Sequence, residues 1–124
     1  MTLIRAEDRL SADLRKPQGG FTGDADQRTI HAREEPAAVR VSFVRFAPGT
    51  TTHWHSHSGG QVLHTVEGEG RAQSRGEAII TLRPGDTVVA AAAEEHWHGA
   101  ASGTGMTHLA VTIGEVSWLE PASA

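Results

Sequence analysis

The chain has 124 residues, of which 38% are hydrophobic and 21% charged, so the composition favours one globular domain with a single core and excludes wholesale disorder. A net charge of −4 without a basic stripe argues against a nucleic-acid partner, and no run approaches the roughly 20 apolar residues of a membrane span. The absence of cysteine excludes disulfides, zinc-thiolate sites and thiol nucleophiles. It also suits a reducing compartment, and no apolar signal segment is visible at the start, so we expect a cytoplasmic protein.

Residues 1–20 carry frequent charges and end in the turn sequence KPQGG, so we expect an N-terminal extension with a helical turn or two over residues 6–14. Residues 21–120 are predicted to form one domain, because clusters of glycine and proline recur there about every 8 to 12 residues. Between these clusters lie short runs rich in Val, Ile and Thr: VRVSFVRF (39–46), QVLHTV (61–66), RAQS (71–74), AIITL (78–82), DTVVA (86–90), HWHGAA (96–101) and MTHLAVTI (106–113). Such short strands are typical of an antiparallel sandwich or barrel, so the predicted fold class is all-β.

Three of the eight histidines lie within five positions of the segment TTHWHSHSGGQ (51–61). Because successive side chains of a strand point to opposite faces, His53, His55 and His57 are predicted to share one face. By the same rule, Gln61 and His64 of the next strand point to opposite faces. A row of imidazoles on one face can be a set of metal ligands, a proton relay or a solvated polar face.

Two later strands carry further histidines. His96 and His98 share a face of their strand. His108 shares a face with Ala110 and Thr112, whose small side chains leave room for a ligand. Imidazole nitrogens and an amide oxygen suit a divalent ion of Mn, Fe, Co, Ni or Zn, and an open coordination position would admit water or substrate.

The spacing of these residues resembles the first of two motifs of the cupin superfamily. That motif is a glycine, a His-x-His pair, a glutamate and a second glycine. Here it reads Gly49, His55, His57, Gln61 in place of the glutamate, and Gly68. The resemblance implies a single-domain cupin, which is a small conical, jelly-roll-like antiparallel β-barrel that is often dimeric and holds one metal ion.

The second cupin motif is met in part. Gly85 and His96 have the expected spacing, whereas Ala91, Ala93 and Ala100 replace the usual Pro, Gly and Asn. By this correspondence the metal ligands would be His55, His57, Gln61 and His96, and His53 falls outside the motif. Three neutral imidazoles and a neutral amide leave the charge of the ion uncompensated, which predicts weaker retention of the metal and a stronger Lewis acid.

The segments TTHWHSHSGGQVL, RPGDTVVAAAAEEHWHGAA and MTHLAV are similar to those of small bacterial cupins of the hydroxynitrile lyase, or (R)-mandelonitrile lyase, group. That group uses manganese or a similar divalent ion. The resemblance implies a lyase that interconverts a small cyanohydrin with an aldehyde and hydrogen cyanide. His108 would accept the hydroxyl proton, with His98 as second choice for the base or as the group that holds cyanide.

The substrate pocket is expected to be shaped by Ser42, Val44 and Thr112. Other functions stay open: an Fe(II) dioxygenase, a non-catalytic cupin that binds a small molecule, and a sugar or keto-acid isomerase. The isomerase is disfavoured because no Lys or Arg is expected to reach the pocket, with Arg45 and Arg71 excluded by strand parity. The expected partners are a small-molecule substrate and a second copy of the chain, in a homodimer or higher homo-oligomer, with no nucleic acid and no membrane.

Overall fold

The computed structural model describes residues 1–7, 14–17 and 19–123, so the helical turns predicted over 6–14 lie almost entirely outside the described residues. The described residues form eleven strands: β1 (Leu14–Arg15), β2 (Ala25–Arg33), β3 (Val39–Phe46), β4 (His53–His57), β5 (Gln61–Gly68), β6 (Gly70–Ser74), β7 (Ile80–Leu82), β8 (Thr87–Ala90), β9 (His96–Ala100), β10 (Met106–Ile113) and β11 (Val116–Pro121). The predicted all-β class is confirmed, and each of the seven predicted runs overlaps a strand.

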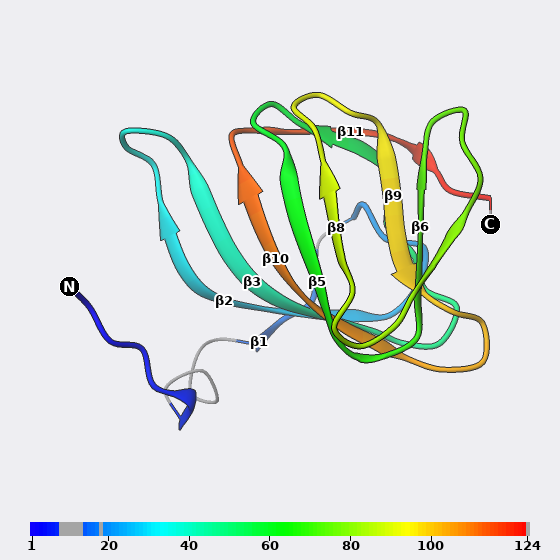
Figure 1. Ribbon diagram of the computed structural model, residues 1–124, viewed down its shortest axis with the longest axis horizontal. Coiled ribbons are helices and arrows are strands. Elements are labelled where there is room, and N and C mark those ends of the chain that lie inside the picture. Colours follow the sequence, from blue (N-terminus) through cyan, green and yellow to red (C-terminus); the bar gives the residue numbers. More distant parts are fainter. Residues whose placement is uncertain (8–13, 18, 124) are drawn as a thin grey trace.

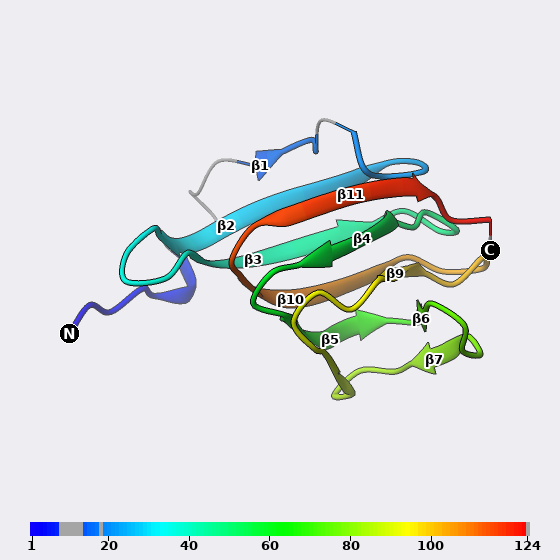
Figure 2. The same cartoon turned by 90° about the horizontal axis from the view of Figure 1, so that it is seen from above.

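The strands form two antiparallel sheets (Figure 1 and Figure 2). The larger sheet has the order β1-β2-β3-β10-β5-β8, and the smaller sheet has the order β11-β4-β9-β6-β7. Strand β1 lies within the predicted N-terminal extension and pairs with β2. The division into an extension over 1–20 and a domain over 21–120 stays a prediction.

Strand parity orders the side chains as the sequence predicts. On β5, Gln61, Leu63 and Thr65 are buried, whereas His64 is exposed. The buried set faces the space between the two sheets, where the larger sheet is covered by the smaller one. The polar members of this buried set therefore need partners inside the protein, because they have left water.

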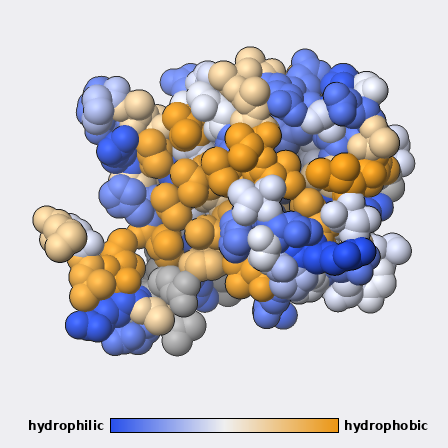
Figure 3. All heavy atoms as spheres, viewed as in Figure 1, coloured by the Kyte–Doolittle hydropathy of each residue, from blue (hydrophilic) through white to orange (hydrophobic). Residues whose placement is uncertain are grey.

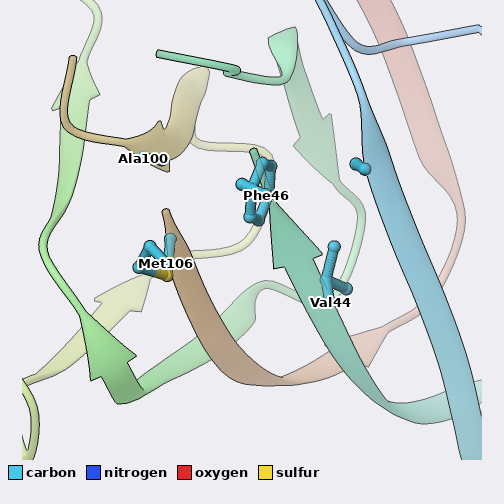
Figure 4. Close-up of a cluster of buried hydrophobic side chains, with 5 residues drawn as sticks. Val44, Phe46, Ala100 and Met106 are labelled. Atoms are coloured by element: carbon cyan, nitrogen blue, oxygen red, sulfur yellow. The ribbon is translucent and has the colours of Figure 1, made fainter. Parts of the chain in front are cut away.

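A cluster of apolar side chains fills one end of the space between the sheets. It consists of Ala25, Val44, Phe46, Ala100 and Met106, all buried, and Figure 4 shows the last four. Phe46 is 1% exposed and Met106 is 2% exposed, so this end of the domain is closed to water. Burial of these side chains is the main favourable contribution to folding at this end.

The register of the larger sheet sets the order of side chains along its inner face. Residues of β2, β3, β10 and β5 lie opposite one another in rows. The first row is Ala32, Arg40, Thr112 and Gln61; the second is Thr29, Ser42, Ala110 and Leu63; the third is Gln27, Val44, His108 and Thr65; the fourth is Ala25, Phe46, Met106 and Gly68. The fourth row contributes to the apolar cluster, so the first row lies toward the opposite end of the domain.

Apolar side chains also gather in the middle of the face shown in Figure 3, with hydrophilic ones around them. The exposed large apolar residues include Val66, Ile79, Ile80 and Val89.

The expected homodimer stays a prediction. In the part of the chain that the structure describes, no helix is long and apolar enough to cross a membrane.

Candidate metal centre

Strands β4 and β9 pair at one point, and that pairing brings two histidines together. His55 lies opposite His96, and the centroids of their rings are 4.4 Å apart. His57 follows on the same face of β4, with its ring 5.0 Å from that of His55 and 5.9 Å from that of His96. Gln61 reaches the group from β5, across the space between the sheets, with its Oε1 atom 3.0 Å from Nε2 of His96. All four predicted ligands are therefore buried in one cluster.

Backbone carbonyls fix which ring nitrogen of two of these histidines carries the proton. Nδ1 of His55 lies 2.8 Å from the carbonyl oxygen of His53, and Nδ1 of His96 lies 2.9 Å from that of Glu94. A carbonyl can only accept, so each Nδ1–H donates and each Nε2 keeps its lone pair. This is the orientation that a metal-binding imidazole has when a backbone group holds its other nitrogen.

The contact between His96 and Gln61 joins two acceptors. The amide nitrogen of Gln61 donates to the Thr112 hydroxyl at 2.9 Å, so its Oε1 atom faces the lone pair of His96 at 3.0 Å. Two lone pairs at this distance repel each other, and a positive charge between them would remove the repulsion. Two adjacent ligands of an octahedral ion with bonds of about 2.1 Å lie about 3 Å apart, so the spacing fits a divalent cation.

A proton is a poor substitute for that cation. Burial, followed by the charge of His96, lowers the pKa of His55 to about 3. Burial, followed by the charge of His96, lowers the pKa of His57 to about 4. Burial also lowers the pKa of His96. These imidazoles are therefore neutral near pH 7, which is the form that binds a metal.

His57 gives a second reason to expect a ligand. Both of its ring nitrogens are buried and have no hydrogen-bond partner among the described residues. A buried polar atom without a partner costs about 1–3 kcal/mol, and such an atom in a native protein calls for an explanation. Coordination of a cation by one of these nitrogens would give His57 the partner that it lacks.

His98 lies closer to the centre than the sequence predicts. The ligand atoms of His55, His96 and His98 lie within 4.8 Å of one another, and Nε2 of His98 has no partner in the described part of the chain. A signal for this is present in the sequence, since His98 shares the face of His96 on β9. The set His55, His57, Gln61 and His96 therefore stays a prediction, with His98 as a further candidate donor.

A cavity of about 500 Å³ adjoins the cluster. Its lining includes the three predicted pocket residues, Ser42, Val44 and Thr112. His98 and His108 also line it, with Nε2 of His108 3.0 Å from Nδ1 of His98. Burial lowers the pKa of His108 to about 4, and its Nδ1 atom has no partner among the residues described.

The prediction that no basic side chain reaches the pocket is wrong. Arg33 and Arg40 both line the cavity. Arg40 has the same parity on β3 as Ser42 and Val44, and its side chain is exposed where it lines the cavity. The sequence carries a signal for Arg40, since it has the parity of the predicted pocket residues Ser42 and Val44.

One departure from the cupin motif lies in the loop between β8 and β9. Ala93 stands where glycine is usual and has φ of 63°, a left-handed conformation that glycine adopts at lower cost. Its N–H donates to the carbonyl of His57 at 2.8 Å. The strained residue therefore ties this loop to the end of β4 that carries His57, and it lies three residues before His96, where β9 begins.

Comparison with known proteins identifies the class to which this fold and site belong. Residues 42–112 match the model of the cupin domain, and the chain belongs to the cupin family. It is 43% identical over 95 residues to an (R)-mandelonitrile lyase from Granulicella tundricola, which covers 77% of this chain and 72% of that protein.

Solved structures agree with this assignment. The chain is similar to a cupin-like protein from Thermotoga maritima, with a TM-score of 0.81 and 35% identity over 86% of this chain and 84% of the other. The polyketide cyclase RemF from Streptomyces resistomycificus has a TM-score of 0.76 and 14% identity over 100% of this chain and 87% of its own. The second similarity shows the fold alone.

Proposed function

We propose that the protein is a metal-dependent lyase that cleaves or forms small cyanohydrins, with an aldehyde and hydrogen cyanide as the other reactants. The observation that carries the proposal is a buried cluster of neutral imidazole and amide acceptors at a cavity of about 500 Å³. The similarity to an (R)-mandelonitrile lyase supports the choice of reaction.

His55, His57, Gln61 and His96 would hold the divalent ion, manganese in our proposal, and His98 is kept for the reacting groups. When bound, the ion would supply Lewis acidity that lowers the pKa of a hydroxyl group. Gln61 contributes through its orientation: because its amide nitrogen is bound by Thr112, its oxygen is directed to the cluster. The absence of a carboxylate from this set leaves the positive charge available to the substrate oxygen.

His108 is the residue that we propose as the base. If its Nε2–H donates to Nδ1 of His98 at 3.0 Å, its Nδ1 atom keeps a lone pair with no other partner in the described structure. That atom can accept the hydroxyl proton of a cyanohydrin in the cavity. In the same arrangement Nε2 of His98 carries a proton and can donate to the departing cyanide.

The proposal is tested with metal-loaded protein and racemic mandelonitrile, following the release of benzaldehyde by its absorbance. We expect turnover that is lost with a chelator and restored by Mn²⁺, and His108→Ala should lower kcat by about 10²-fold or more. His64→Gln, on the exposed face of β5, is the matched control and should keep full activity. Activity that survives chelation, or that is undiminished in His108→Ala, would contradict the assignment, and oxygen consumption during turnover would favour a dioxygenase.

A further inference from the structure

Arg40 is a basic side chain at the cavity that the proposed reaction does not use. It lies in the first row of the larger sheet, opposite Thr112 of β10, and Thr112 in turn lies opposite Gln61 of β5. Neighbouring strands are about 4.8 Å apart, so the backbones of Arg40 and Gln61 are about 10 Å apart across the inner face. The long side chain of Arg40 and the candidate metal centre therefore border the same cavity.

The guanidinium of Arg40 has no partner in the described structure. It forms no ion pair or hydrogen bond with any described residue, although Glu34 and Glu115 also line the cavity. Other arginines are engaged: Nε of Arg33 donates to the Ala37 carbonyl, and Arg75 pairs with two glutamates. Arg40 can therefore bind an anion without breaking an existing contact.

We propose that the cavity takes a small molecule that carries a carboxylate, which Arg40 binds while the hydroxyl or carbonyl end of the molecule lies against the histidine cluster. The planar guanidinium matches a carboxylate with two parallel hydrogen bonds. The spacing across the sheet suits a ligand whose two polar ends are separated by about the width of an aromatic ring. The substrate class that follows, a cyanohydrin bearing a carboxylate, rests on the proposed function, whereas the carboxylate subsite does not.

The subsite is tested by binding alone, with two probes that differ only in the carboxylate. 4-(Hydroxymethyl)benzoate and benzyl alcohol are titrated into metal-loaded protein by calorimetry. We expect the carboxylate probe to bind about 5- to 10-fold more tightly at low salt, a range set by a charge-assisted contact at a partly exposed site. The preference should shrink as salt is added, because exposed charges are screened.

Variants assign the preference to Arg40. Arg40→Gln should abolish the preference for the carboxylate probe. Arg40→Lys should retain part of the preference, because the positive charge stays but the two parallel hydrogen bonds of the guanidinium are lost. Arg45→Gln is the matched control, since Arg45 is an exposed arginine of the same strand on the opposite face, and it should keep the full preference. Equal binding of the two probes, no binding of either, or a preference that survives in Arg40→Gln would overturn the inference.

A parallel measurement separates this inference from the proposed function. Mandelonitrile and its 4-carboxy analogue are compared by kcat/KM in the same variants. If neither cyanohydrin is cleaved but the carboxylate probe still binds better through Arg40, the lyase proposal fails and the subsite stands. If both cyanohydrins are cleaved with equal kcat/KM and the two probes bind equally, the lyase stands and the subsite is overturned.

Discussion

Acidification should destabilise the metal-free protein at a pH where its carboxylates are still ionised. Burial lowers the pKa of His55 to about 3, and those of His57 and His108 to about 4, from 6.5. Below pH 6.5 these three imidazoles therefore bind protons in the unfolded chain but stay unprotonated in the folded chain. The stability that these neutral imidazoles confer is fully present above pH 6.5 and is lost as the pH falls toward 4.

The size of the effect follows from the number of buried imidazoles. Each contributes about 1.4 kcal/mol per pH unit inside this window. Three of them should lower the free energy of unfolding by about 4 kcal/mol between pH 7.5 and 5.5, which is a large part of the 5–15 kcal/mol typical of a domain. Burial lowers the pKa of His96 and His98 as well, so these residues act in the same direction.

The assay is urea unfolding followed by tryptophan fluorescence at pH 7.5, 6.5 and 5.5, in the presence of a chelator. His108→Gln should lose about a third of the pH dependence given by the three imidazoles, relative to its own stability at pH 7.5. His64→Gln, a substitution on the exposed face of β5, is the matched control. A loss below about 1 kcal/mol between pH 7.5 and 5.5 would refute the reasoning, since it would mean that the histidine cluster takes up protons in the folded state.

Other residues give predictions that the same assay and metal titration can check. Ala93→Gly should raise the free energy of unfolding by about 0.5–1 kcal/mol, because it relieves a left-handed alanine, and no gain would place the strain elsewhere. Gln61→Glu should tighten Mn²⁺ binding by at least about tenfold in competition with a chelator, because a carboxylate opposes the charge of the ion; unchanged affinity would remove Gln61 from the ligand set. Phe46→Ala should lower the free energy of unfolding by about 3–5 kcal/mol, since Phe46 is 1% exposed, and a loss below about 1 kcal/mol would contradict its place in the core.

The strands that the sequence predicted best are those with buried alternate positions and clear turns. The bounds of β3 and β10 match the predicted runs 39–46 and 106–113, because each alternates between a buried face and a partly covered one. Strand β2 was not predicted. Its sequence, ADQRTIHAR, is mostly polar and grows more exposed toward Arg33, because this end of the strand lies where the cavity opens and has no apolar core to cover.

The candidate site was predictable to the extent that it depends on parity within one strand. The faces of His55, His57 and His108 follow from alternation alone. The proximity of His98 to the cluster does not follow from alternation, because it depends on which residue of β9 lies opposite His55. A shift of one residue in that pairing would turn the side chains of His96 and His98 away from the cluster. A contact between strands 40 positions apart in the sequence requires the register, which only the structure supplies.

Strand β10 shows how one face of one strand organises the whole site. Its inner side chains alternate along the strand, so Met106 packs in the apolar cluster, His108 contacts His98, and Thr112 binds the amide of Gln61. Because Thr112 accepts from the amide nitrogen, it forces the amide oxygen toward His96, and it also lies opposite Arg40. The closed end of the cavity, the proposed base, a proposed ligand and the carboxylate subsite are thus set by a single register, so a slip of β10 by one residue would remove all four together.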